Sequence, residues 1–287
     1  MKHSLYRAVA SIGLLTSLAL LSPAAQAFDL NPTIGLGFEL TTGDYGTDTD
    51  TTALFIPFTL MFQPSENWGI SLEIPYVYQN NTNVIASQAS PRGSTVRSAQ
   101  ITAAMRDGFG TGMAGMQSTA NTNPSQSRWG LGDISLRLAY NLIHETETIP
   151  LIRPSVTVKF PTADESRGLG TGEFDEEIAV ELAKWLGDWN VFVQPGYTFQ
   201  GNSPDIPLKD FWTFNAGLGY QVTDRFQPMV MLKSAGAPVE GAGSLLEARL
   251  RLKYLATQKT GIEGYLAKGL TTSTADYGTG LAVYYDF

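Results

Sequence analysis

The stretch GLAVYYDF at residues 280–287 decides the fold expected for this chain. Apolar and polar residues alternate along it, so that Leu281, Val283, Tyr285 and Phe287 share one face of a strand. A terminal strand that ends on phenylalanine resembles the recognition signal of outer-membrane barrels, whose closing strand is read by the barrel-assembly machinery. We therefore expect the chain to form a transmembrane β-barrel and Phe287 to mark the strand that this machinery contacts.

The same alternation recurs along the chain in about twelve segments, most of them near the length that a tilted strand needs to cross a bilayer. We predict strands at residues 31–40, 52–63, 68–79, 129–143, 149–162, 176–186, 189–200, 211–222, 226–235, 244–256, 260–270 and 277–287.

The gaps between these segments are short and long in turn. The short gaps suit hairpin turns and lie at residues 64–67, 144–148, 187–188, 223–225 and 257–259. The long gaps, mostly rich in Gly, Asp, Thr, Ser and Asn, lie at 41–51, 80–128, 163–175, 201–210, 236–243 and 271–276. An up-and-down barrel with short periplasmic turns and longer external loops produces this rhythm. The predicted fold class is all-β: one up-and-down antiparallel transmembrane barrel of about 12 strands, with both termini on the periplasmic side.

One face of each segment is apolar, as contact with lipid requires, and the other is polar, as a polar barrel interior requires. In segment 244–256, for example, Leu250 and Leu252 alternate with Arg249, Arg251 and Lys253. The tryptophans lie near strand ends, as the aromatic belts of membrane proteins predict. They are Trp68, Trp129, Trp185, Trp189 and Trp212. Strict alternation, however, turns Trp129 and Trp185 inward.

Residues 1–27 have the features of a cleaved secretory signal peptide. Lys2 and Arg7 form a basic start, residues 8–21 are almost wholly apolar, and AQA at 25–27 is a small-x-small cleavage site. The apolar run is shorter than the ~20 residues of a transmembrane helix. We expect cleavage after Ala27 and a single barrel domain over residues 28–287, exported to the outer membrane of a Gram-negative cell.

Composition excludes several other classes of protein. The formal net charge of −8 argues against a nucleic-acid partner, because such a partner requires a basic face. The absence of cysteine excludes thiol redox centres and disulfide scaffolds.

Several short motifs resemble a family of outer-membrane transporters of the MetA pathway of phenol degradation. They are LEIPYV at 72–77, GLGDI at 130–134, VKFPT at 158–162, GLGTG at 168–172 and LGD at 186–188. The resemblance implies an outer-membrane barrel that passes small organic molecules, aromatic ones among them. It implies no catalytic or binding residues. Residues 80–128 are the part of the chain that least resembles the family.

Charged residues on the polar faces of the predicted strands are the best functional candidates. One group lies on adjacent strands between residues 129 and 186, and a second lies on the strands 226–235 and 244–256. Either their electric field selects small solutes, or they form ion pairs that brace a narrow barrel. The candidates for lining the lumen are Arg137, Arg153, Lys159, Glu177, Glu181, Lys233, Glu247, Arg249, Arg251 and Lys253.

The remaining motifs predict no chemistry. GTGMAG at 110–115 matches a dinucleotide-binding pattern but follows no strand of a βαβ unit. His144 lies in a predicted turn with no serine evidently placed to pair with it, and the acidic stretches at 44–50 and 164–175 lack the spacing of a calcium loop. We therefore expect no catalytic residue, no cofactor, no metal and no enzyme activity.

The functional expectation is an outer-membrane channel for passive or weakly selective uptake of small organic molecules. The alternative is a structural or adhesive barrel with a plugged lumen. The long gap at 80–128 exceeds an ordinary connection, and its segment 95–116 either constricts the pore mouth or forms an external loop. Expected partners are outer-membrane lipid, the assembly machinery and a small-molecule solute.

Overall fold

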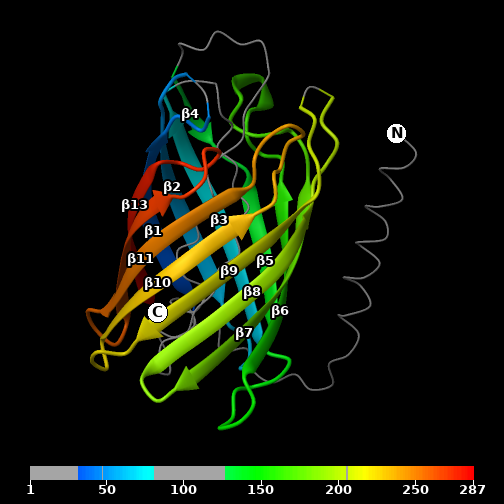
Figure 1. The fold of residues 1–287 in the computed structure, drawn as a ribbon. Coiled ribbons are helices and arrows are strands. Elements are labelled where there is room, and N and C mark those ends of the chain that lie inside the picture. The colour runs from blue at the N-terminus through cyan, green and yellow to red at the C-terminus, as the bar shows by residue number, and fades with distance from the viewer. Residues whose placement is uncertain (1–31, 47, 81–126, 205) are drawn as a thin grey trace.

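The computed structural model describes residues 32–46, 48–80, 127–204 and 206–287 (Figure 1). Its elements are β1 (Thr33–Gly43), β2 (Thr51–Phe62), β3 (Trp68–Gln79), β4 (Arg128–Leu131), β5 (Ile134–Tyr140), β6 (Leu151–Phe160), η1 (Glu165–Arg167), β7 (Asp175–Leu186), β8 (Trp189–Phe199), β9 (Phe211–Tyr220), β10 (Phe226–Ala235), β11 (Leu245–Leu255), β12 (Thr260–Gly269) and β13 (Tyr277–Asp286). The predicted signal peptide, the segment 95–116 and the GTGMAG stretch lie outside the described residues.

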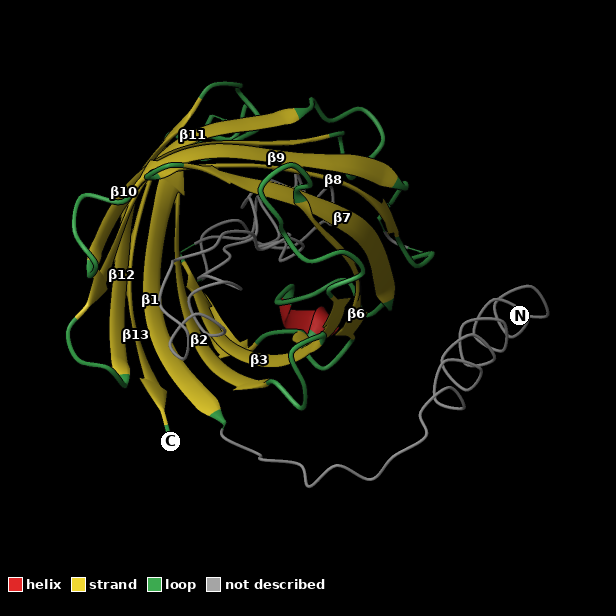
Figure 2. Ribbon diagram, turned by 90° about the horizontal axis from the view of Figure 1, so that it is seen from below, coloured by secondary structure: helices red, strands yellow, loops and turns green. Residues whose placement is uncertain are grey.

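The strands close into a ring, which Figure 2 shows from below. β1 pairs with β2 on one side and with β13 on the other, so that Thr33 is aligned with both Met61 and Asp286. β4 and β5 both pair with β3 and are two halves of one interrupted strand. The fold is therefore a closed antiparallel barrel of twelve strands, as predicted. Closure thus gives each described strand of the ring a hydrogen-bonded neighbour on both sides.

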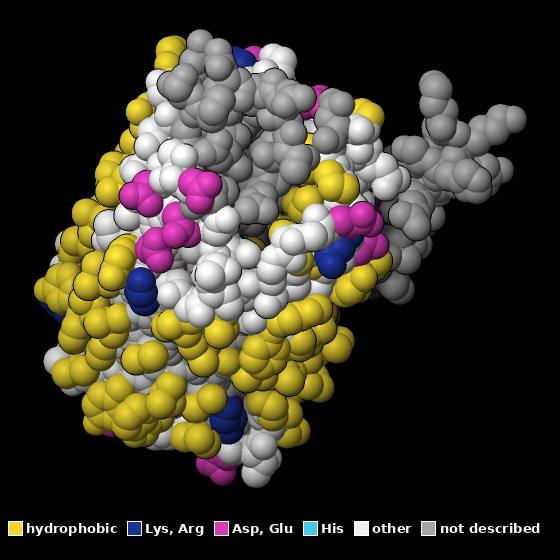
Figure 3. Space-filling model, turned by 45° about the horizontal axis from the view of Figure 1, so that its top comes forward, with side chains coloured by type: hydrophobic (Ala, Val, Ile, Leu, Met, Phe, Trp, Pro, Cys, Tyr) yellow, Lys and Arg dark blue, Asp and Glu magenta, His cyan; other side chains and the backbone are white. Residues whose placement is uncertain are grey.

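The outer wall is apolar and the inner wall is polar, because successive side chains of a strand point to opposite faces. In β11, Leu250 and Leu252 are exposed on the outside, whereas Arg249 and Arg251 are buried. Figure 3 shows hydrophobic side chains covering much of the outer wall, with Asp and Glu gathered near the top. Among the described residues, no helix is long and apolar enough to span a bilayer.

Most strand boundaries agree with the sequence analysis, and β3 and β10 match it to the residue. The turn between β7 and β8 consists of Gly187 and Asp188, and Gly187 has a φ of 64°, which glycine adopts without a steric cost. The turn between β5 and β6 is longer than predicted, because β5 ends at Tyr140. An isolated bridge between Ile143 and Ile152 of β6 extends the pairing of this hairpin beyond the end of β5.

A β-bulge interrupts the strand formed by β4 and β5 and corrects one inward position. Tyr76 of β3 is aligned with Leu131, but Glu73 is aligned with Ser135, so one extra residue lies between these two pairs. The extra residue reverses which face each side chain of β4 occupies. Trp129 is consequently 54% exposed on the outer wall, where strict alternation predicted an inward ring.

Trp185 keeps the inward parity that its strand predicts. It follows the buried residues Glu181 and Ala183 on β7 and is itself partly buried at the end of the strand. Its backbone N–H donates to the Glu145 carboxylate at 2.7 Å. An aromatic belt therefore accounts for Trp129, Trp189 and Trp212, all exposed, but not for Trp185.

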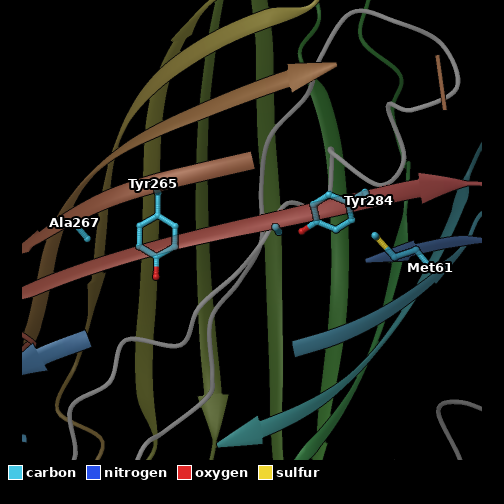
Figure 4. Close-up of a cluster of buried hydrophobic side chains, with 5 residues drawn as sticks. Met61, Tyr265, Ala267 and Tyr284 are labelled. Carbon is cyan, nitrogen blue, oxygen red and sulfur yellow. The ribbon is translucent and has the colours of Figure 1, made fainter. Parts of the chain in front are cut away.

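Three interior aromatic rings are each matched with a glycine on the neighbouring strand. Tyr265 is aligned with Gly280, and Phe192 is aligned with Gly217. Tyr284 is aligned with Gly35, and a Cβ at Gly35 would lie 2.6 Å from the Tyr284 ring. Tyr265 and Tyr284 belong to a cluster with Met61 and Ala267 (Figure 4). The missing side chain of each glycine gives the ring room to lie close to the barrel wall.

Replacing Gly280 with alanine is expected to destabilise the barrel by about 1–3 kcal/mol, because the new methyl group overlaps the Tyr265 ring. Urea titration of the folded protein in lipid vesicles measures the change. Gly264→Ala is the matched control, since the nearest atom to its added methyl group is 3.5 Å away. Equal losses for the two variants would show that the ring does not depend on Gly280.

Candidate functional site: the barrel interior

All ten predicted lining residues have buried side chains on the inner wall. Arg137 lies on β5, and Lys233 on β10. The others form pairs or runs along single strands: Arg153 and Lys159 on β6, Glu177 and Glu181 on β7, and Glu247, Arg249, Arg251 and Lys253 on β11. Their exposed fractions range from 0% for Glu181 to 8% for Lys159.

A charged network joins β11 and β12 to β1. The Arg249 guanidinium lies 2.6 Å from Glu247 and stands over the Tyr265 ring, 3.9 Å from its centroid. The Tyr265 hydroxyl donates to Glu39 at 2.7 Å. Arg251, one inward position further along β11, pairs with Glu263. Two cations of the stretch that is basic in sequence are therefore paired with carboxylates, Arg249 with one on β11 itself and Arg251 with one on β12.

A second group of buried charged residues lies on the part of the inner wall formed by β5, β6 and β7. Arg153 and Glu181 are aligned across the β6–β7 ladder and form a 2.8 Å ion pair. Glu177 accepts a 2.9 Å hydrogen bond from Thr213 of β9. Arg137 donates to Ser155 at 3.4 Å. The structure thus brings together the residues that the sequence placed on adjacent strands.

Lys159 anchors the segment 161–174 between β6 and β7. Its ammonium lies 2.6 Å from Asp175 and 3.3 Å from Asp133, and donates to Thr171 at 3.1 Å. Asp133, the inward residue of the bulge, also accepts the backbone N–H of Ala163 at 3.0 Å. Three motifs of the family resemblance, GLGDI, VKFPT and GLGTG, therefore meet at one ammonium group.

The same segment turns toward the barrel mouth. Figure 2 draws η1 within the outline of the ring, near β6. Leu169 is 2% exposed and is the nearest neighbour of a Cβ built at Gly130. A hydrogen bond from Ser166 lowers the pKa of Asp164, and partial burial raises the pKa of Glu173.

The buried charges of the residues that the structure describes nearly balance. The cations are the seven residues Arg137, Arg153, Lys159, Lys233, Arg249, Arg251 and Lys253. The carboxylates are the eight residues Glu39, Glu73, Asp133, Asp175, Glu177, Glu181, Glu247 and Glu263. Among the described residues the buried charges therefore sum to −1, whereas the whole chain carries a formal net charge of −8. Most of the acidic excess lies outside this interior set.

Sequence reasoning missed several of these groups. Glu263 occupies an inward position of a predicted strand, and its alternation with Ile262 could have revealed it. Asp133 was also missed, although it has the same parity as Arg137 in the predicted strand 129–143, so alternation could have revealed it. The buried amides Gln194 and Gln227 were not among the candidates, because a neutral polar side chain is a weaker sequence signal than a charged one.

The weaker candidates remain separate from this interior. His144 is exposed and pairs with Asn67, with 2.6 Å between Nε2 and Oδ1. In the described part of the chain, no group of three or more His, Asp or Glu side chains could hold a metal ion.

The apolar outer wall, closed ring and charged interior define a β-barrel of the outer-membrane type. A family model described as "Putative MetA-pathway of phenol degradation" matches residues 65–287. The chain belongs to this family. A comparison with curated proteins found no match.

Solved structures share the fold at low sequence identity. A crystal structure of an outer-membrane channel from Pseudomonas putida F1 is 12% identical with a TM-score of 0.63, covering 93% of this chain and 100% of that one. The NanC porin is 9% identical with a TM-score of 0.50, covering 89% of this chain and 100% of that one. These likenesses support the barrel architecture.

Proposed function

We propose that the protein is an outer-membrane channel through which small organic molecules pass by passive or weakly selective diffusion. The observation that carries the proposal is a closed barrel with an apolar outer wall and a buried, charged inner wall. A barrel that only anchored the chain in lipid would not need charges inside, because burying each of them costs free energy. Membership of a family described by phenol degradation supports small organic solutes, aromatic ones among them.

We also propose how the protein reaches the outer membrane. Residues 1–27 direct export and are removed, and the strand ending at Phe287 is bound by the barrel-assembly machinery. On β13, Leu281, Val283 and Tyr285 are 54%, 44% and 41% exposed, and Phe287 just beyond it is 55% exposed. Such a partner would contact this exposed apolar face of the last strand.

A structural or adhesive barrel is the second candidate. The ion pairs Arg153–Glu181 and Arg251–Glu263 join neighbouring strands and favour a bracing role for some interior charges. This reading predicts a barrel that seals the membrane.

Liposome swelling distinguishes the two candidates. Vesicles that contain the protein are expected to swell in isosmotic arabinose faster than protein-free vesicles, and more slowly in larger neutral sugars. Heat-unfolded protein added to the same lipid is the control for leakage. Vesicles that stay sealed to every solute would contradict the channel and support the structural barrel.

A further inference from the structure

Neutral carboxamides, rather than charges, line one part of the inner wall. Asn190 and Gln194 lie on β8, Asn215 on β9 and Gln227 on β10. Gln194 and Gln227 are fully buried, and Asn215 is 2% exposed. These strands are neighbours in the sheet, so the amides form a continuous part of the wall.

Several of these amides have unused hydrogen-bonding capacity. Among the described residues, both polar atoms of Gln194 and of Gln227, and Nδ2 of Asn215, have no hydrogen-bond partner. Buried polar atoms are nearly always paired, and an unpaired one costs about 1–3 kcal/mol. By contrast, the charged groups Arg153 and Lys159 each contact a carboxylate. The unpaired amides are therefore exceptions that a ligand would resolve.

On this wall, apolar side chains separate the amides of Gln194 and Asn215 from the amide of Gln227. Gln194 is aligned with Asn215, and the next inward residue of β9, Gly217, is covered by the Phe192 ring. One inward position further, Gly219 is covered by Met229 and by the Gln227 amide, whose Nε2 lies 3.1 Å from a Cβ built there. Asn215 and Gly219 are four residues apart, about 13 Å along a strand.

The charges beside the amides do not favour an ion of either sign. Lys233 is aligned with Asn215 and also with Glu247 on its other side. Glu181, on the strand before β8, is paired with Arg153 at 2.8 Å. A carboxamide itself has no net charge and offers both donors and an acceptor.

We propose that the β8–β10 wall binds uncharged organic solutes that carry a hydrogen-bonding group on an apolar body. The polar group pairs with Gln194 and Asn215, the apolar body contacts Phe192 and Met231, and Gln227 forms a second polar contact toward the short turns. Met231 and Phe192 belong to one buried cluster. The inference rests on the proposed channel function and names its substrate class.

Single-channel recording in planar bilayers tests this with three solutes of the same shape. Benzamide is neutral, benzoate is an anion and benzamidinium is a cation at neutral pH. We expect benzamide to interrupt the ion current at a lower concentration than either ion. Gln194→Leu is expected to weaken the benzamide effect about tenfold, because two hydrogen bonds are lost. Gln63→Leu, at an exposed turn glutamine, is the matched control and should leave it unchanged.

Two further variants keep the test independent of folding. Gln227→Leu should also weaken the benzamide effect, and Gln194→Glu, which keeps the shape, should shift the preference from benzamide to benzamidinium. Urea titration shows whether each variant folds. If Gln194→Leu raises stability while benzamide acts as before, the amides contact only water and the inference is wrong.

The failure of the inference differs from the failure of the function. A wild-type protein that carries no ion current and admits no solute contradicts the channel itself. A conducting channel on which the three solutes act equally contradicts only the substrate class.

Discussion

Lys159→Met is expected to destabilise the barrel by about 3–5 kcal/mol, because it removes the one cation that, among the described residues, forms ion pairs with two buried carboxylates. Asp133 and Asp175 are 2% and 7% exposed and lie 3.3 and 2.6 Å from the Lys159 ammonium. Without it their negative charges repel each other in a poorly solvated site. Urea titration followed by tryptophan fluorescence measures the free energy of unfolding.

The same substitution should loosen the segment 161–174. This segment is tied to the wall through Thr171 and through the Ala163–Asp133 hydrogen bond, so proteolysis after Arg167 should become faster than in the wild type. Lys268→Met is the matched control, because the Lys268–Asp276 pair is 3.7 Å long and about half exposed. Such a pair contributes about 0–1 kcal/mol. A Lys159 effect no larger than this control would show that the buried cluster does not hold the segment.

Leu250→Arg is expected to cost about 2–4 kcal/mol if the outer wall lies in hydrocarbon. Leu250 is 44% exposed at the middle of β11, aligned with the outward residues Val230 and Leu266. A guanidinium there has no polar partner within the bilayer. The free energy of unfolding in vesicles measures the cost.

The control is the same substitution at a position nearer the membrane surface. Leu270 is 53% exposed just beyond the end of β12, where an arginine can reach headgroups and water. Leu270→Arg is expected to cost about 0–1 kcal/mol. Equal costs at the two positions would mean that Leu250 is not in hydrocarbon, and the membrane barrel would then be wrong.

The strands were predictable because alternation is a local property of the chain. A residue such as Arg251 must point away from lipid if Leu250 and Leu252 point toward it, so the inward set on β11 follows from the sequence alone. The same reasoning placed Arg153 and Glu181 inside. It could not say that they form a pair, since that requires the register of β6 against β7.

The bulge marks where local reasoning fails. One extra residue between Leu131 and Ser135 reverses the faces of β4, which brings Trp129 out. Nothing within the segment announces the extra residue, because it exists only relative to the partner strand β3. The unpaired amides of Gln194 and Gln227 are similar, as a missing partner is visible only when all neighbours are in place.

The sequence by itself determined a twelve-stranded closed barrel, the two faces of its wall and the inward position of its main charges, because these depend on side-chain alternation and gap length. Only the tertiary structure decided which charges pair, how Lys159 joins residues of three motifs and where the wall is neutral. These depend on strand register, which sets residues from opposite ends of the chain, such as Glu39 and Tyr265, within hydrogen-bonding distance.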